Sequence, residues 1–153
     1  MFEAARLAGL DTGGDWEFRV WFLDDRAMAQ AHVETMNVEG ATDVITLAYL
    51  EEPEALFPGD MGLELIVGAE VALREGKLHP ENGYAGELML YIVHGCLHAA
   101  GENDLCEADR LRMRRREAEV LAVLRSHYDF RAIFPEPQST PPVGTAPEKA
   151  RRS

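Results

Sequence analysis

Hydrophobic and polar residues alternate in a short segment near the start of the chain. In DWEFRVWFL (15–23), the apolar residues Phe18, Val20 and Phe22 recur at every second position, which is the period of a half-buried strand. The next segment, 24–37, begins with two aspartates and continues with many Ala, Met and Gln residues. It is therefore predicted to be a helix with an aspartate N-cap.

Further strands and helices are expected from similar patterns. Residues 42–50 and 61–68 are rich in β-branched and other apolar side chains, so both segments are predicted strands. Residues 51–59 between them hold two prolines and a glycine and are expected to be a loop. Helices are predicted at 69–78, 83–101 and 105–128.

The segment 83–101 differs from the other helices because it is apolar on almost every side. Such a helix belongs at the centre of a domain, where other elements cover it. Gly101 is expected to end it, because glycine accepts the left-handed conformation of a helix terminus. Strands and helices mix without strict alternation, so we predict an α+β fold with a small sheet and further helices around this central helix.

Composition is consistent with a globular protein. The hydrophobic content is 46%, and no apolar run is long enough to cross a bilayer. We expect one catalytic domain at 1–133 and a disordered tail at 134–153, since this last segment holds five of the eight prolines. No signal peptide is recognised, so a cytoplasmic location is expected. The net charge of −12 argues against indiscriminate binding to nucleic acid.

The strongest chemical signal is the stretch HGCLHAAGEND at 94–104. His94 and His98 are four residues apart, so on a helix both imidazoles project toward one point and can bind one divalent metal. Gly101 lets the chain turn back, and Asp104 can then supply a carboxylate oxygen. Three protein ligands leave a coordination position for water, which is typical of a catalytic zinc site. One zinc ion is expected, with another divalent metal as the alternative.

This stretch also allows other interpretations. A histidine pair alone is often a coincidence, but the glycine turn, the acidic residue and the apolar context favour a metal. The spacing is that of metzincin proteases, yet Gly95 stands where these carry the glutamate that acts as base. Peptide hydrolysis is therefore the less favoured alternative. Cys96 and Cys106 are expected to be free thiols, with Cys106 a less favoured ligand.

The motif H-G-x-L-H, with its glycine turn and third ligand, resembles the YbeY-type endoribonucleases, a family of bacterial rRNA maturation factors. The resemblance spans roughly residues 17 to 125. T-D-V-I-T at 42–46 is similar to that family's Thr-Asp-Val-Leu-Ser strand, and Glu87-Leu88 to its Glu-Leu pair. The further matching residues are Gly59-Asp60-Met61, Met113, Glu117 and Val120-Leu121.

The resemblance implies a cytoplasmic, metal-dependent hydrolase that cleaves single-stranded RNA in 16S rRNA 3′-end maturation and ribosome quality control. It implies an α+β fold with a mixed sheet, and zinc held at the end of the central helix by His94, His98 and Asp104. Expected partners are single-stranded RNA, rRNA, and the small ribosomal subunit with its assembly factors. No DNA or membrane partner is expected.

Two positions depart from the pattern of that family. Its third metal ligand is usually histidine, whereas Asp104 is anionic and makes the site less positive. Many members carry an arginine six residues before the T-D-V strand, and Met36 stands there instead. Met36 cannot stabilise an anion, so a metal-stabilised ribosome-assembly factor with little catalysis is an alternative function.

Positive charge is concentrated in the segment 110–116, which holds five arginines. The apolar stripe of this helix leaves Arg112, Arg114 and Arg115 facing outward. They form either a solvated face paired with neighbouring acidic residues or an edge that contacts RNA phosphate. The remaining candidates are Asp43, as a turn cap or a border of the substrate groove, and Glu117, as a packing residue, an arginine partner or a support of the site.

Overall fold

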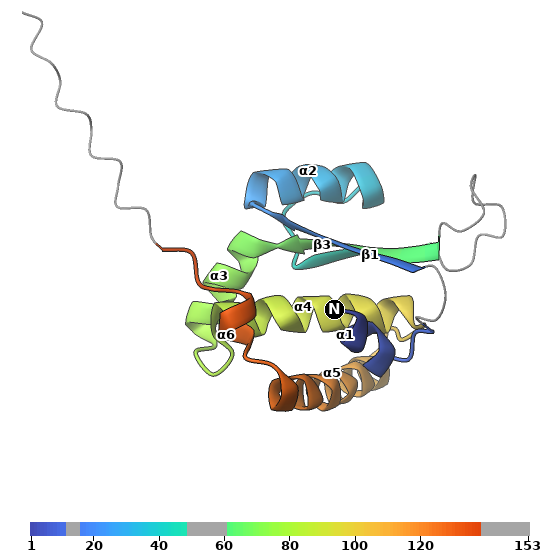
Figure 1. The fold of residues 1–153 in the computed structure, drawn as a ribbon. Helices are drawn as coiled ribbons and strands as arrows, with labels where there is room; N and C mark the ends of the chain where they lie inside the picture. The colour runs from blue at the N-terminus through green and yellow to red at the C-terminus, as the bar shows by residue number, and fades with distance from the viewer. Residues whose placement is uncertain (12–15, 49–60, 139–153) are drawn as a thin grey trace, which may run out of the picture.

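The computed structural model describes residues 1–11, 16–48 and 61–138. Within these ranges β1 runs parallel to β3, and β2 runs antiparallel to it, in one sheet of order β1-β3-β2. The predicted α+β fold with a small mixed sheet is therefore confirmed (Figure 1). The elements are α1 (Phe2–Leu7), β1 (Trp16–Leu23), α2 (Asp25–Met36), β2 (Val44–Ala48), β3 (Met61–Gly68), α3 (Ala69–Leu78), α4 (Gly83–Ala99), α5 (Glu107–His127) and α6 (Phe130–Ile133).

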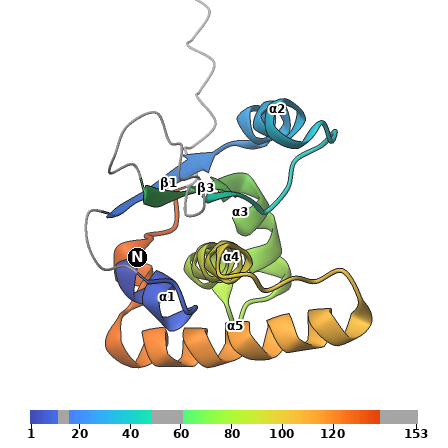
Figure 2. The ribbon, with the colours of Figure 1, turned by 90° about the vertical axis from the view of Figure 1, so that its right-hand side faces the viewer.

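The sheet lies between α2 and α4, and α5 runs on the far side of α4 (Figure 1). Seen along its axis, α4 is enclosed by the sheet, α1, α3 and α5 (Figure 2). Residues along most of the length of α4 are buried. The prediction of a covered central helix is confirmed, and His94 and His98 lie near the C-terminal end of that helix.

The alternating pattern of β3 explains how the sheet serves two layers. Leu63, Leu65 and Val67 are buried in the main core, which also contains the apolar residues of α4. Ile66 points to the opposite face and packs with Met28 of α2 in a second, smaller cluster. Successive side chains of a strand alternate between faces, so this central strand joins α4 to α2.

The edge strand β1 follows the predicted alternation only in part. Phe18 and Val20 are partly buried and pack against the main core. Phe22 is 42% exposed and instead contacts the ring of Phe134, with 5.6 Å between the centroids. Phe134 is the first residue of the predicted tail, and 139–153 lie outside the described residues, so the domain boundary stays a prediction.

Both predicted helix ends have the expected local chemistry. The Asp24 side chain accepts a hydrogen bond from the backbone N–H of Ala27 at 2.8 Å, which confirms the aspartate N-cap of α2. The central helix ends at Ala99, and Gly101 adopts φ +97, the left-handed conformation expected there. The chain thus turns back directly after the second histidine.

Some expectations fall outside what the structure describes, and some elements were not expected. The predicted loop at 51–59 lies outside the described residues. The short helices α1 and α6 were not predicted, because four to six residues are too few to show helical periodicity.

Among the described residues, no helix combines the length and apolar character that a bilayer span requires.

Candidate metal centre

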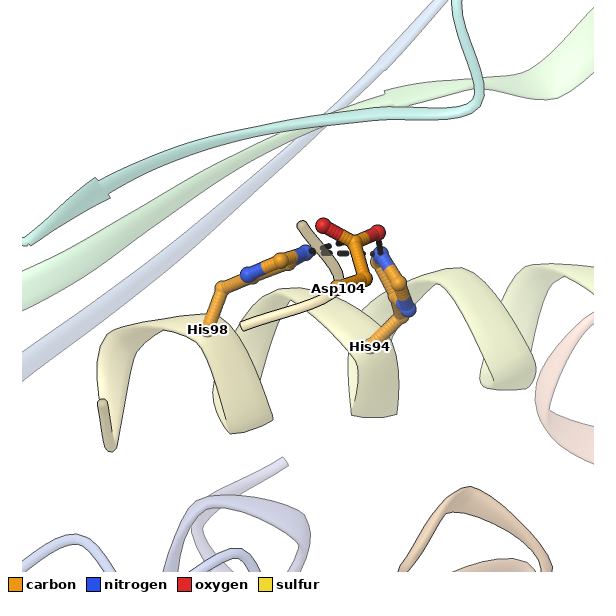
Figure 3. A group of neighbouring side chains, drawn as sticks. All are labelled: His94, His98 and Asp104. Carbon is orange, nitrogen blue, oxygen red and sulfur yellow. Dashed lines mark hydrogen bonds and ion pairs between the residues drawn. The ribbon is translucent and has the colours of Figure 1, made fainter. Parts of the chain in front are cut away.

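His94 and His98 project from the same side of α4 toward the loop that follows the helix (Figure 3). Their Nε2 atoms lie 2.9 Å apart, and the two rings meet at an interplanar angle of 83°. The side chains are 21% and 31% exposed, respectively. The helical spacing therefore places two imidazoles together at the rim of the core, as the sequence predicted.

Asp104 completes the group from the loop after α4 (Figure 3). Its Oδ2 lies 3.9 Å from Nε2 of His94 and 3.7 Å from Nε2 of His98. The three residues offer one ligand atom each, and all three atoms lie within 4.8 Å of one another. The turn at Gly101 brings the carboxylate back over the helix end, so the predicted triad converges in space.

The outer nitrogen of each imidazole has a partner that orients the ring. Nδ1 of His94 donates to Oε1 of Glu117 on α5 at 2.5 Å, and Nδ1 of His98 donates to the carbonyl oxygen of Glu102 at 3.0 Å. A carbonyl can only accept, so His98 carries its proton on Nδ1, and the carboxylate favours the same tautomer for His94. This arrangement leaves both Nε2 lone pairs facing each other.

The donor set fits a divalent metal ion. Two facing lone pairs at 2.9 Å repel each other unless a proton or a cation lies between them. Zinc with bonds of about 2.0–2.1 Å in a tetrahedron places neighbouring ligand atoms about 3.4 Å apart. The observed separations of 2.9, 3.7 and 3.9 Å bracket that value. The carboxylate of Asp104 adds negative charge that favours a cation at this position.

Gly95 shows why a protease-type base is absent from this helix. A Cβ atom at position 95 would lie 2.6 Å from Cδ2 of Leu65 and 3.0 Å from Oγ1 of Thr46. These two residues are register partners on β3 and β2. The helix therefore packs so closely on the sheet that a glutamate here would meet the core, which counts against a peptidase of the metzincin design.

A hollow of about 260 Å³ opens beside the triad. Asp43 lines it from the start of β2, where its Oδ1 also accepts from the backbone N–H of Val44 at 2.8 Å. Both interpretations of Asp43, as a turn residue and as a border of the hollow, therefore have a structural basis. The remaining lining residues are Leu90, Tyr91, His94, Asp104, Arg110, Met113, Arg114 and Glu117.

Burial and carboxylates set the protonation of two lining residues. Burial alone lowers the pKa of His94, but the hydrogen bond and charge of Glu117 outweigh burial and raise that pKa above its ordinary value. Burial, together with the nearby charge of Glu87, raises the pKa of the Tyr91 hydroxyl. Tyr91 is therefore a neutral phenol at neutral pH, whereas His94 readily takes a proton when no metal is bound.

Of the three arginines that the sequence proposed for substrate contact, only one lines the hollow. Arg114 lines the hollow, whereas Arg112 and Arg115 do not, and Arg112 pairs with Asp109 at 2.7 Å. The sequence placed these three arginines on one outward face. It did not single out Arg110, although its i, i+4 spacing from Arg114 could have shown that these two share a face.

Other candidates lie away from the triad. Met36 ends α2, is 59% exposed and is not a lining residue of the hollow. Cys96 is buried, and burial raises the pKa of its thiol to about 12, so it stays protonated. Cys106, the less favoured ligand, is exposed, and its Sγ lies 3.0 Å from Oδ2 of Asp109. It is not a member of the His94, His98 and Asp104 group.

Comparison with known proteins identifies relatives over most of the chain. The family model described as endoribonuclease YbeY matches residues 4–125. A protein named endoribonuclease YbeY from Chlamydia trachomatis is 35% identical over 108 residues, covering 71% of this chain and 66% of that protein. The match therefore spans about two thirds of the length of this relative.

Relatives from other bacteria carry the same name. The endoribonuclease YbeY of Clostridium botulinum is 30% identical over 126 residues, covering 71% of this chain and 75% of the relative. That of Chlamydia pneumoniae is 29% identical over 114 residues, covering 73% of this chain and 72% of the relative. The segment matched by the family model contains the whole His94, His98 and Asp104 group.

Proposed function

Because this chain belongs to the YbeY endoribonuclease family, we propose that it is a metal-dependent endoribonuclease that cuts single-stranded RNA in rRNA maturation. The observation that supports a catalytic rather than a binding role is the convergence of two Nε2 atoms and one carboxylate beside an open hollow. Three ligands leave a position for a reacting group, which is typical of catalytic sites.

We propose that His94, His98 and Asp104 hold one zinc ion. A bound zinc ion would supply a Lewis acid that polarises a phosphoryl oxygen and lowers the pKa of water. Glu117 keeps the proton of His94 on Nδ1, and the carbonyl of Glu102 does the same for His98. These two hydrogen bonds orient both rings so that their Nε2 atoms point toward the position that we propose for the metal.

Membership of the family supports the substrate and the setting proposed for this chain. We propose that the hollow beside the triad receives the RNA backbone, with Asp43 at its border and two arginines of α5, Arg110 and Arg114, at its edge. In the cell the substrate would be the 16S rRNA 3′ end within the small ribosomal subunit, reached together with assembly factors in the cytoplasm. Neither DNA nor a membrane is part of this proposal.

A cleavage assay with matched histidine variants tests the function. Zinc-loaded protein is incubated with an end-labelled single-stranded RNA and with the same RNA in a duplex. We expect cleavage of the single strand. In His98→Ala, cleavage should fall by more than the roughly 10–100-fold that is typical when a residue that only supports a metal ligand is replaced. His127→Ala, which removes an exposed histidine paired with Glu3, should cleave as the wild type does.

The same assay separates the alternatives. Binding of the RNA without cleavage by zinc-loaded wild type would contradict the proposal and favour a ribosome-assembly factor. Cleavage of an unfolded protein substrate, but not of RNA, would favour the peptidase. Neither alternative finds support in the family comparison.

A further inference from the structure

The arginines at the start of α5 separate into two groups by helix face. Arg110 and Arg114 line the hollow beside the triad, together with Met113 and Glu117 of the same helix. These positions follow the i, i+3, i+4, i+7 spacing of a single helix face. Arg110 and Arg114 are exposed, so their guanidinium groups can reach a ligand that enters from solvent.

The other arginines of this segment are engaged or directed elsewhere. Arg112 donates to Oδ1 of Asp109 at 2.7 Å. Arg116 donates to the backbone carbonyl of Leu7 at 3.0 Å, which ties α5 to the first helix. Arg115 is exposed and is not a lining residue of the hollow. The arginine-rich segment is therefore not one uniform basic edge.

Among the described residues, the two lining arginines have no ionic partner of their own. Within 1–11, 16–48 and 61–138, the guanidinium groups of Arg110 and Arg114 make no hydrogen bond or ion pair. They are also the only Lys or Arg residues that line the hollow in this part of the chain. The carboxylates of Asp43, Asp104 and Glu117 line it as well, so an entering anion needs these two cations to offset repulsion.

We propose that Arg110 and Arg114 form the phosphate-binding pair of this chain and hold an RNA backbone phosphate next to His94 and Asp104. The inference rests on the proposed function and adds the residues that grip the substrate. Side chains at i and i+4 of a helix are neighbours, with about 5–6 Å between Cβ atoms, so both guanidinium groups reach one phosphate. The planar guanidinium matches two phosphate oxygens at once, which lysine does not.

The experiment compares three double variants under single-turnover conditions. Arg110→Gln with Arg114→Gln removes the pair, and Arg112→Gln with Arg115→Gln removes two charges from the same helix outside the hollow. Arg26→Gln with Lys77→Gln makes the same change in net charge on α2 and α3, at exposed positions. Single-stranded RNA cleavage is measured against protein concentration at several salt concentrations, and zinc content and melting temperature are measured in parallel.

We expect removal of the pair to raise the half-saturating protein concentration at least tenfold, with unchanged zinc content. The slope of log affinity against log salt should fall by about 0.7, because the pair neutralises one phosphate and each neutralised phosphate of a single strand contributes about 0.7. The two other variants should change the half-saturating concentration less than threefold. Equal weakening in all three variants, or none in the first, overturns the pair while the function stands. A wild type that leaves RNA intact overturns the function itself.

Discussion

Glu117 is expected to strengthen metal binding although it is not a ligand. Its Oε1 accepts from Nδ1 of His94 at 2.5 Å, and its side chain is only 15% exposed. Replacing it with alanine removes the acceptor and the charge together, while glutamine retains an acceptor and removes only the charge. The pair of variants therefore separates orientation of the imidazole from electrostatic support.

The expected loss of zinc affinity depends on how well water can replace the Glu117 carboxylate at His94. Both side chains are mostly buried, so water cannot fully replace the carboxylate when Glu117 is truncated. Loss of such a partner typically weakens metal affinity 10–100-fold, or about 1.4–2.7 kcal/mol. We expect Glu117→Ala in this range. Glu117→Gln should lose less, because its amide oxygen still accepts from Nδ1.

The assay is a competition titration of zinc against a fluorescent chelator, with melting temperatures recorded for each variant. Glu119→Ala is the control, because this carboxylate is on the same helix, is 61% exposed and pairs with Arg116 instead. It should bind zinc as the wild type does. If Glu117→Ala keeps the wild-type dissociation constant within twofold, the carboxylate does not orient the metal site.

Further predictions concern pH and packing. The raised pKa of His94 means that zinc must displace a proton from this imidazole. Zinc affinity should therefore rise with pH and level off above that pKa. A zinc affinity that does not change between pH 6 and 8 would contradict this. In an open helix Gly95→Ala would add about 1 kcal/mol of helix stability, but here the methyl group would lie 2.6 Å from the fully buried Leu65. Overpacking costs about 1–3 kcal/mol, which leaves a net loss of up to about 2 kcal/mol. We therefore expect calorimetry to show a melting temperature up to about 8 °C lower, and a higher one would refute the close packing.

The elements that sequence predicted well are those whose own residues carry a long periodic signal. The apolar segment at 83–101 indicated a central helix, and its two histidines had to meet because four residues return to the same face. Asp104 was also accessible to prediction, since a glycine turn of a few residues restricts where the chain can go. The triad is local in sequence, and local geometry is what periodicity determines.

Contacts between distant segments were not determined by such patterns. The bond between Glu117 and His94 joins residues on different helices, so it depends on how α5 crosses α4. Sequence left Glu117 with three possible roles for this reason. Sequence also did not show which arginines of α5 face the hollow. That depends on how α5 packs against α4, and only the structure shows that Arg110 and Arg114 line the hollow.

The three residues of the His94, His98 and Asp104 group differ in how freely they could be substituted. His94 and His98 stand on a helix whose neighbouring Gly95 has no room for a Cβ atom, so the frame that aims both rings tolerates little change. Asp104 stands on a loop, with its side chain 41% exposed, and a larger side chain could be accommodated there without repacking the core. A substitution at position 104 would therefore change the charge beside the two histidines without disturbing the packing that orients their rings.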